Sequence, residues 1–400
     1  MLNFSLIILV FRLTNSNTVT ATFLLMAMIP AIIFGVFAGV VADRFDKRKI
    51  LLFCDLAIGL VMLLFIPFAG TPPLILTVAF LLNVIFQFFI PAEAAALPTI
   101  VPRENLLAAN SIFQFTPTAA LIVGSTAAGP IVANFGYNPV FIFGASAMVA
   151  TFFIRRALPA LPPEKHMAFN IKTESLVRLI VLSKVQIREG IRFILSDKYV
   201  WVPILTLSFI QAAGSTIAVL APGFMEQILR IEATDSSLIL LLPFGIGLGL
   251  GAFLTATAAS KTPVRIIVIR GMLICGLAII AMALTPVVGA SLAHKEFLAR
   301  HIRPFSKAFT VSIWISFFAT FVGFGAAQVV IPMQTILQKN TLTRFRGRVF
   351  AVWSTLIAMS VSVPALAAGA IADILGVIWA MVLVGICVVA AGLLGLRRFF

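Results

Sequence analysis

The chain has 400 residues, of which 61% are hydrophobic and only 11% charged, and its mean hydropathy is +1.12. Soluble proteins carry roughly 25% charged residues, so this composition excludes a soluble globular protein. Apolar runs of about 20 residues recur along the chain, which is the length an α-helix needs to cross a bilayer, whereas the strands of a membrane barrel alternate over about 10 residues. We therefore predict an all-α polytopic membrane protein, with the lipid bilayer as its surroundings.

The first residues, MLNFSLIILVFRLTNSN, are apolar for a stretch too short to cross a bilayer before Arg12 is reached. They lack the basic segment and the cleavage site of a signal peptide. We interpret them as the second half of a first helix whose beginning is missing, which makes twelve helices with the complete spans that follow. Those spans are expected at roughly 19–42, 50–69, 74–92, 106–131, 137–154, 200–222, 236–258, 264–285, 308–332, 348–371 and 375–396.

Lysine and arginine are distributed unevenly over the loops: 23 of the 29 follow the even-numbered helices. Positive charge marks the cytoplasmic side of a membrane protein, so we predict that these loops and the C-terminus are cytoplasmic. For the same reason the net charge of +15 is not interpreted as a nucleic-acid site. One loop on the other side, AHKEFLARHIRPFSK, is also basic, and it either forms a helix along the interface or shows that the span boundaries there are wrong.

The longest connection, residues 155–199, divides the chain into an N-terminal bundle at 1–154 and a C-terminal bundle at 200–400. It begins with the Pro-rich RRALPALPPEKH and continues with apolar residues that repeat near one helical face. This pattern suits an amphipathic helix on an anionic cytoplasmic leaflet. A solvated linker helix is the alternative.

The loop between the second and third helices carries a recognisable motif. Gly39, Asp43 and Arg44 are followed by Lys47 and Arg48, which resembles the G-x-x-x-D-R-x-G-R-R/K signature of the major facilitator superfamily. Asp46 stands where the signature has glycine. A loop that is merely basic on the cytoplasmic side would not require Gly39 and Asp43 at these offsets.

Two further segments, PAEAAALPTIVPRENLLAANSI and LQKNTLTRFRGRVFAVWS, lie at equivalent places in the two halves. Both resemble loops of the branch of this family that contains macrolide-efflux proteins and the enterobactin exporter. The resemblance implies a twelve-helix fold in two six-helix bundles around a central substrate site. It also implies a conformational latch in which Asp43 contacts the start of the eleventh span near Arg346 and Arg348 when the cytoplasmic side is closed.

Several polar side chains fall inside predicted spans, where ionisable groups are expensive and commonly functional. Asp55 and Glu93 are candidates for ion coupling, and interfacial pairing with basic residues is the alternative for both. Five amides are candidates for lining a cavity or for hydrogen bonding between helices. They are Asn83, Gln87, Gln114, Gln211 and Gln328.

The fifth span ends VGSTAAGPIVANFG, in which Gly124, Gly129 and Pro130 partly match the G-x-x-x-G-P-x-x-G-G signature of drug–proton antiporters. Ala133 and Asn134 replace the final glycine pair. Small residues also allow close helix packing, so these three residues are predicted to form a gate or a packing contact. The resemblance favours export.

The sequence has no G-x-x-x-x-G-K-S/T motif for ATP, and its three histidines and three cysteines show no metal-binding spacing. No cofactor, no metal and no enzymatic activity are therefore predicted. We predict a secondary active exporter of hydrophobic or amphipathic small molecules, monomeric, in the inner membrane and coupled to protons. A lipid or lysophospholipid translocator and a non-transporting receptor or scaffold remain the alternatives.

Overall fold

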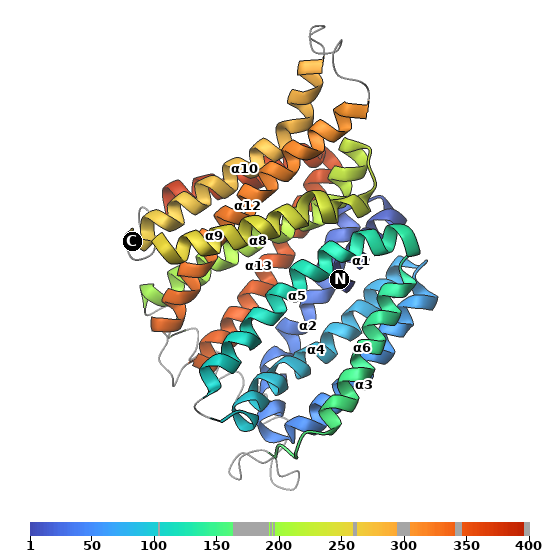
Figure 1. The fold of residues 1–400 in the computed structure, drawn as a ribbon, viewed down its shortest axis with the longest axis vertical. Coiled ribbons are helices and arrows are strands. Elements are labelled where there is room, and N and C mark those ends of the chain that lie inside the picture. The colour runs from blue at the N-terminus through green and yellow to red at the C-terminus, as the bar shows by residue number, and fades with distance from the viewer. Residues whose placement is uncertain are drawn as a thin grey trace.

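The computed structural model describes residues 1–102, 105–162, 192, 194, 197–258, 262–293, 305–340 and 346–395. Twelve α-helices run up and down through these ranges (Figure 1). The first six are α1 Leu2–Thr14, α2 Asn17–Arg44, α3 Lys47–Phe68, α4 Pro72–Ile100, α5 Leu106–Phe135 and α6 Asn138–Arg156. The others are α8 Lys198–Gly223, α9 Leu242–Ala258, α10 Val264–Ala293, α12 Phe305–Asn340, α13 Arg346–Leu375 and α14 Val377–Ala390. Short turns precede or extend three of them: η2 Phe224–Leu229, η3 Ala233–Asp235, η4 Ser237–Leu241 and η6 Ala391–Gly395.

The helices form two halves. In the N-terminal half α2 packs on α4, and α3 packs on α4 and α6. In the C-terminal half α12 packs on α9 and α10, while α8 packs on α13 and α10 on α14. The halves meet where α2 lies along α13 and α8, and where α5 meets η3 and η4. The predicted arrangement in two six-helix bundles is confirmed.

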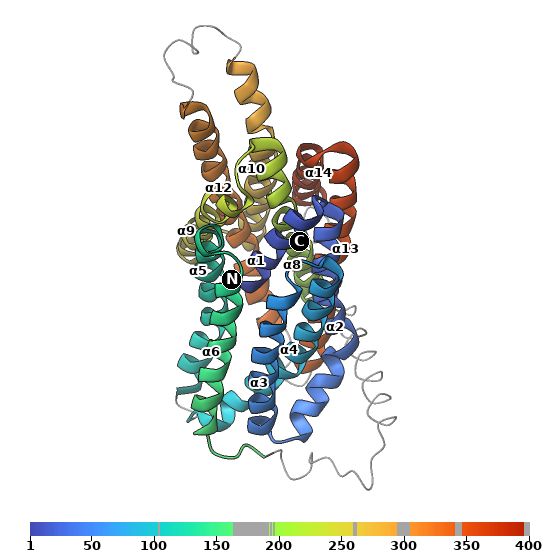
Figure 2. The ribbon, with the colours of Figure 1, turned by 90° about the vertical axis from the view of Figure 1, so that its right-hand side faces the viewer.

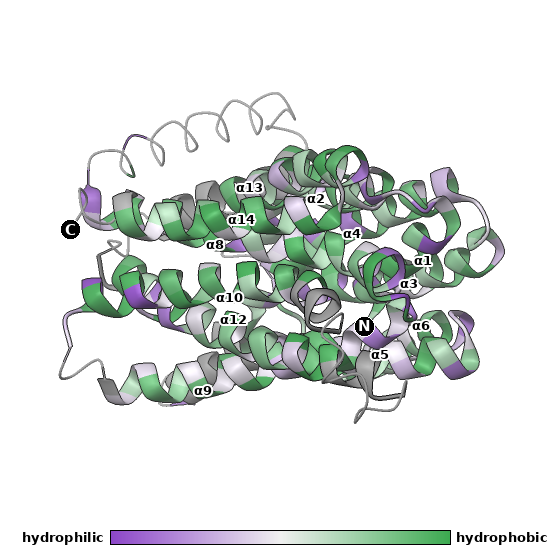
Figure 3. Ribbon diagram, turned by 90° about the horizontal axis from the view of Figure 1, so that it is seen from above, coloured by the Kyte–Doolittle hydropathy of each residue, from purple (hydrophilic) through white to green (hydrophobic). Residues whose placement is uncertain are grey.

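Each half has its own apolar core. The backbone hydrogen bonds of a membrane helix are made within the helix, so neighbouring helices associate mainly through close packing of their side chains. Phe65 of α3 stacks on Phe141 of α6 with ring centroids 5.3 Å apart. Leu207 of α8 packs in a second cluster with Met272 and Met333. Hydrophobic residues dominate the helices in Figure 3.

Successive helices run in opposite directions, so the turns between them fall at two ends of the molecule. The turns at 15–16, 69–71, 136–137, 230–232 and 376 lie at one end, called here the outer end, and those at 45–46, 101–102 and 157–162 lie at the inner end. Two outer turns require glycine, because Gly136 and Gly376 have φ of 75° and 93°. The distribution of basic residues predicts that the inner end is cytoplasmic.

The predicted spans correspond to the helices with shifted boundaries. Nine helical stretches of the described residues are long and apolar enough to cross a membrane, and three shorter apolar helices accompany them. Three spans were predicted to end too early. Helix α4 continues to Ile100 instead of 92 and α12 to Asn340 instead of 332, and α10 continues through Pro286 to Ala293 instead of 285. With α12 it extends beyond the other helices (Figure 2). The amphipathic linker helix and most of the AHKEFLARHIRPFSK loop fall outside the described residues.

Candidate functional site

Three contacts described below join the two halves at the outer end, and the first is made by a carboxylate at the interface. Asp373, near the end of α13, accepts hydrogen bonds from the backbone amides of Asn17 at 2.9 Å and Thr18 at 3.0 Å. The side chains of Ser16, Asn17 and Thr18 also donate to it, at 2.7, 2.9 and 2.7 Å. These amides begin α2 and have no partner within their own helix. The C-terminal half therefore caps a helix of the N-terminal half.

Close packing of small residues surrounds this cap. A Cβ on Gly369 of α13 would lie 2.7 Å from the backbone oxygen of Asn17. A Cβ on Gly223 of α8 would overlap the amide oxygen of the same Asn17 side chain. Ala21, Val219 and Ala365 form a small buried cluster beside them. The backbones of α2, α8 and α13 can approach this closely because glycine stands at the crossing points.

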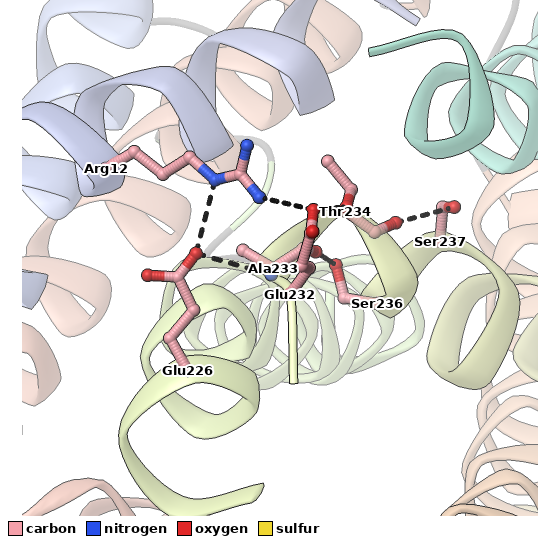
Figure 4. A network of polar contacts seen from close by, with 7 residues as sticks. All are labelled: Arg12, Glu226, Glu232, Ala233, Thr234, Ser236 and Ser237. Atoms are coloured by element: carbon pink, nitrogen blue, oxygen red, sulfur yellow. Dashed lines mark hydrogen bonds and ion pairs between the residues drawn. The ribbon is translucent and has the colours of Figure 1, made fainter. Parts of the chain in front are cut away.

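A second contact is made by Arg12, at the end of α1 (Figure 4). Its guanidinium donates from Nε to Glu226 at 3.3 Å and from Nη2 to Glu232 at 3.0 Å. Hydrogen bonds from Arg12 and Thr234 lower the pKa of the Glu232 carboxyl below its ordinary value of 4.5. Because the Glu232 side chain is 67% exposed, this pair is screened by solvent and contributes at most about 1 kcal/mol.

The third contact involves the predicted gate residues. Gly129 of α5 lies against Ser237 and the backbone oxygen of Thr234, which hold the turn into α9. Pro130 follows inside α5. Gly124 lies instead beside Met1, whose amine nitrogen would be 3.1 Å from an added Cβ. Of the three, Gly129 is the one whose Cβ would overlap the opposite half, and close packing there is part of its role.

The two candidate coupling acids are brought together by a residue that the sequence did not single out. Arg155 of α6 donates to Asp55 of α3 at 2.8 Å and to Glu93 of α4 at 2.6 Å. Its guanidinium also lies 4.6 Å from the ring centroid of Phe89. Asp55 is fully buried, and its Oδ2 has no hydrogen-bond partner among the described residues. This triad joins three helices of the N-terminal half near their inner ends.

The latch residues are placed on helix ends. Gly39 and Asp43 lie in the last turns of α2, and Arg346 and Arg348 in the first turn of α13. The side chains of Asp43, Arg346 and Arg348 are outside the described atoms, so their contact stays a prediction. Arg44, the next residue of the motif, does interact with another group.

The start of α3 shows how the motif loop is held. Lys47 is buried and its amide donates to Leu161 at 3.1 Å, while Arg48 donates to the backbone oxygen of Arg156. Asp46, the departure from the family motif, accepts from the amide of Arg48 at 2.9 Å and caps α3.

The candidate cavity residues have different surroundings. Gln328 is fully buried, and its Oε1 accepts from Arg270 Nε at 3.0 Å, so it joins α12 to α10. Asn83 donates to the carbonyl of Ala79 in its own helix. Gln87 faces Gly35 of α2 and Gln211 is exposed. The Gln114 side chain is outside the described atoms.

Sequence reasoning missed Arg155, Glu226, Glu232 and Asp373. The acids at the outer end and Arg155 all stand at span boundaries, where charges are ordinary, so their positions alone carried no signal. Only the packing of α13 on α2, of α1 near the end of α8 and of α6 on α3 shows what they contact.

Residues 1–299 match the Major Facilitator Superfamily. The MFS-type transporter YkuC of Bacillus subtilis is 26% identical over 74% of this chain and 69% of its own length. The putative bacilysin exporter BacE of the same organism is 24% identical, with 86% and 78% covered. The enterobactin exporter EntS of Escherichia coli is 26% identical over 53% of this chain and 49% of its own length.

Solved structures share the fold at low sequence identity. A POT family transporter in complex with 5-aminolevulinic acid superposes with a TM-score of 0.71 and 14% identity, covering 99% of this chain and 92% of that one. A bacterial homologue of the human lysosomal transporter Spinster gives 0.70 and 14%, covering 100% and 94%. The helices, the two halves and the match over most of the sequence lead to one conclusion: this chain belongs to the Major Facilitator Superfamily.

Proposed function

We propose that this protein exports hydrophobic or amphipathic small molecules by alternating access, driven by a proton gradient. The observation that carries the proposal is the outer end, where the two halves are held together by hydrogen bonds and ion pairs. Contacts of this kind can break without unfolding either half, because each half keeps its own apolar core. A central site between the halves would then open first to one side and then to the other.

Export is favoured by two observations. Two of the relatives are named exporters, one of bacilysin and one of enterobactin. The partial antiporter motif also lies at the outer contact, where Gly129 meets the turn into α9. Motion at that contact would release a substrate on the outer side.

Proton coupling is supported by the buried triad. Asp55 has one carboxylate oxygen bonded to Arg155 and the other without a partner among the described residues. Glu93 shares the same guanidinium. A proton taken up by either acid would loosen the link between α3, α4 and α6, and the sequence has no ATP-binding motif to supply energy in another way.

The proposal includes a monomer in the inner membrane with its C-terminus in the cytoplasm. It is tested with purified protein in liposomes loaded with a catecholate siderophore, a macrolide, a dipeptide antibiotic or a lipophilic dye. We expect movement of at least one of them to accelerate when a pH gradient is imposed, and the Asp55→Asn variant to lose the acceleration. Asp197→Asn is the matched control, because Asp197 lies outside the triad and accepts from the backbone amide of Tyr199 within the C-terminal half.

The outcomes separate the alternatives. Movement of a lysophospholipid with none of these solutes would favour the lipid translocator. Movement that ignores the gradient would remove proton coupling and leave the transporter. If no solute and no lipid moves in either direction, the export proposal fails.

A further inference from the structure

Helices α2 and α13 are an antiparallel pair that crosses the boundary between the two halves (Figure 1). Each ends with an acid close to its C-terminus. Asp373 is the third residue from the end of α13, which finishes at Leu375, and Asp43 is the second from the end of α2, which finishes at Arg44. In an antiparallel pair the end of one helix lies beside the start of the other. Asp373 therefore lies beside the start of α2 in the opposite half, and Asp43 belongs to the inner end of the same helix pair.

At the outer end the Asp373 carboxylate is hydrogen-bonded to the start of α2. Five hydrogen bonds reach the Asp373 carboxylate, two of them from the first backbone amides of α2, and all are between 2.7 and 3.0 Å. A carboxylate at a helix N-terminus gains both from the amides and from the positive end of the helix dipole. Hydrogen bonds to an ionised acceptor are roughly twice as strong as neutral ones.

The cap depends on closure of the outer end. Asn17, the central donor, is fully buried between Gly223 of α8 and Gly369 of α13. When α13 moves away from α2, the five bonds break together, and the first amides of α2 lose the partner supplied by the C-terminal half. The contact thus stabilises one conformation of the molecule, rather than the fold of either half.

We infer that Asp373 is a positioning residue that holds the transporter closed at its outer end by capping α2 from the opposite half. The latch that the family resemblance implies for Asp43, at the other end of the same helix pair, would oppose Asp373 by favouring closure at the inner end. The two carboxylates then act on one equilibrium in opposite directions. This inference rests on the proposed alternating access, but its test measures conformation and not transport.

The test uses the full chain with its three cysteines replaced by alanine and two spin labels attached to new ones. Gly70→Cys and Trp379→Cys place exposed labels at the outer end, one on each half. Pro102→Cys and Ile266→Cys do the same at the inner end. Distances between labels are measured by pulsed electron paramagnetic resonance, without substrate.

Asp373→Asn keeps the shape of the side chain and removes its charge. We expect the ratio of outer-open to outer-closed molecules to rise by about tenfold, with a longer outer distance and a shorter inner one. Asp43→Asn should change both distances the other way. Asp197→Asn is the matched control, because Asp197 caps α8 within its own half by accepting from Tyr199 at 2.8 Å, and it should leave both distributions unchanged.

A second variant guards against misfolding. Thr18→Val removes one side-chain donor at 2.7 Å from the carboxylate and should produce a smaller shift in the same direction as Asp373→Asn. Unchanged outer distances in both Asp373→Asn and Thr18→Val would overturn the inference, even if transport were intact. An outer distance that lengthens in Asp43→Asn would overturn the opposition between the two acids. Absence of transport in the unaltered protein would count against the proposed function instead.

Discussion

Gly129 of α5 lies so close to Ser237 of η4 that a Cβ at position 129 would overlap the serine hydroxyl. The two residues belong to opposite halves of the molecule, and the turn at Ser237 is fixed by its hydrogen bond to Thr234 at 3.0 Å. There is accordingly little room for the turn to move away while the outer end stays closed. Glycine at this position is a condition for the closed state.

We predict that Gly129→Ala opens the outer end. Overpacking a close contact costs typically about 1–3 kcal/mol, and here the cost falls on the closed state alone. Labelling of Ala21→Cys by a membrane-impermeant maleimide should therefore increase, because Ala21 is fully buried beside Val219 and Ala365. The control is Gly249→Ala in α9, where an added Cβ meets nothing within 4 Å. Equal labelling in both variants would contradict the prediction.

A second prediction concerns the pH dependence of the contact between Arg12 and Glu232. Arg12 lowers the pKa of Glu232 below 4.5 in the closed state. A carboxyl whose pKa is lowered by a contact stabilises it fully above its ordinary pKa, and the stabilisation is lost as the pH falls through the lowered value. If Glu232 is the group that titrates, the distance between the outer labels at Gly70→Cys and Trp379→Cys should stay constant from neutral pH down to about pH 5. It should lengthen only below about pH 4.5.

Glu232→Gln provides the control for this titration. It removes the ionisable group but keeps a hydrogen-bond acceptor. The lengthening of the outer label distance below the ordinary pKa of 4.5 should therefore disappear. The effect should also weaken at high salt, since both side chains are partly exposed. A lengthening near neutral pH that persists in Glu232→Gln would assign the titration to another group.

The third prediction concerns the stability of the N-terminal half. Arg155→Met leaves Asp55 buried with no charged partner and separates it from Glu93. Breaking a buried pair by removing one partner costs about 3–5 kcal/mol, whereas replacing both partners by apolar groups is often neutral. Thermal unfolding in detergent should therefore show a lower midpoint for Arg155→Met, and Asp55→Leu with Arg155→Met should recover most of it. No recovery in the double variant would mean that the triad acts mainly through Glu93.

Much of the fold could be predicted from the sequence, because apolar length and basic loops report directly on how a chain sits in a membrane. The boundary at α10 could not, since Pro286 is accommodated inside the helix and proline is tolerated in membrane helices. Gly129 was identified through a motif, but its neighbour Ser237 was not. A motif gives the residue that must be small and says nothing about what it touches.

The candidate site was predicted less well than the fold for a physical reason. Asp55 and Glu93 were selected because acids inside spans are rare, yet the arginine between them is near the end of α6, where basic residues are common. Gln328 was selected as a polar group in a span, and it bonds to Arg270 between two packed helices. Whether a polar side chain faces a partner helix or a cavity depends on the rotation of its helix. That rotation follows from packing, to which the hydropathy of a span gives little guide.

The last prediction concerns orientation, on which the names of the two ends depend. Of the 29 lysines and arginines, 23 follow every second helix in chain order, which are α2, α4, α6, α9, α12 and α14. The described parts of these connections lie at the inner end. If positive charge sets the orientation, the turn at Pro102 is cytoplasmic and the turn at Gly70 is external. Both residues are exposed and lie in turns that border α4, so they form a matched pair on the two sides of one helix. In intact cells an impermeant maleimide should label Gly70→Cys and should reach Pro102→Cys only after the membrane is made permeable. The reverse result would place Asp373 and Arg12 on the cytoplasmic side, and the outer contact described here would then close the route from the cytoplasm.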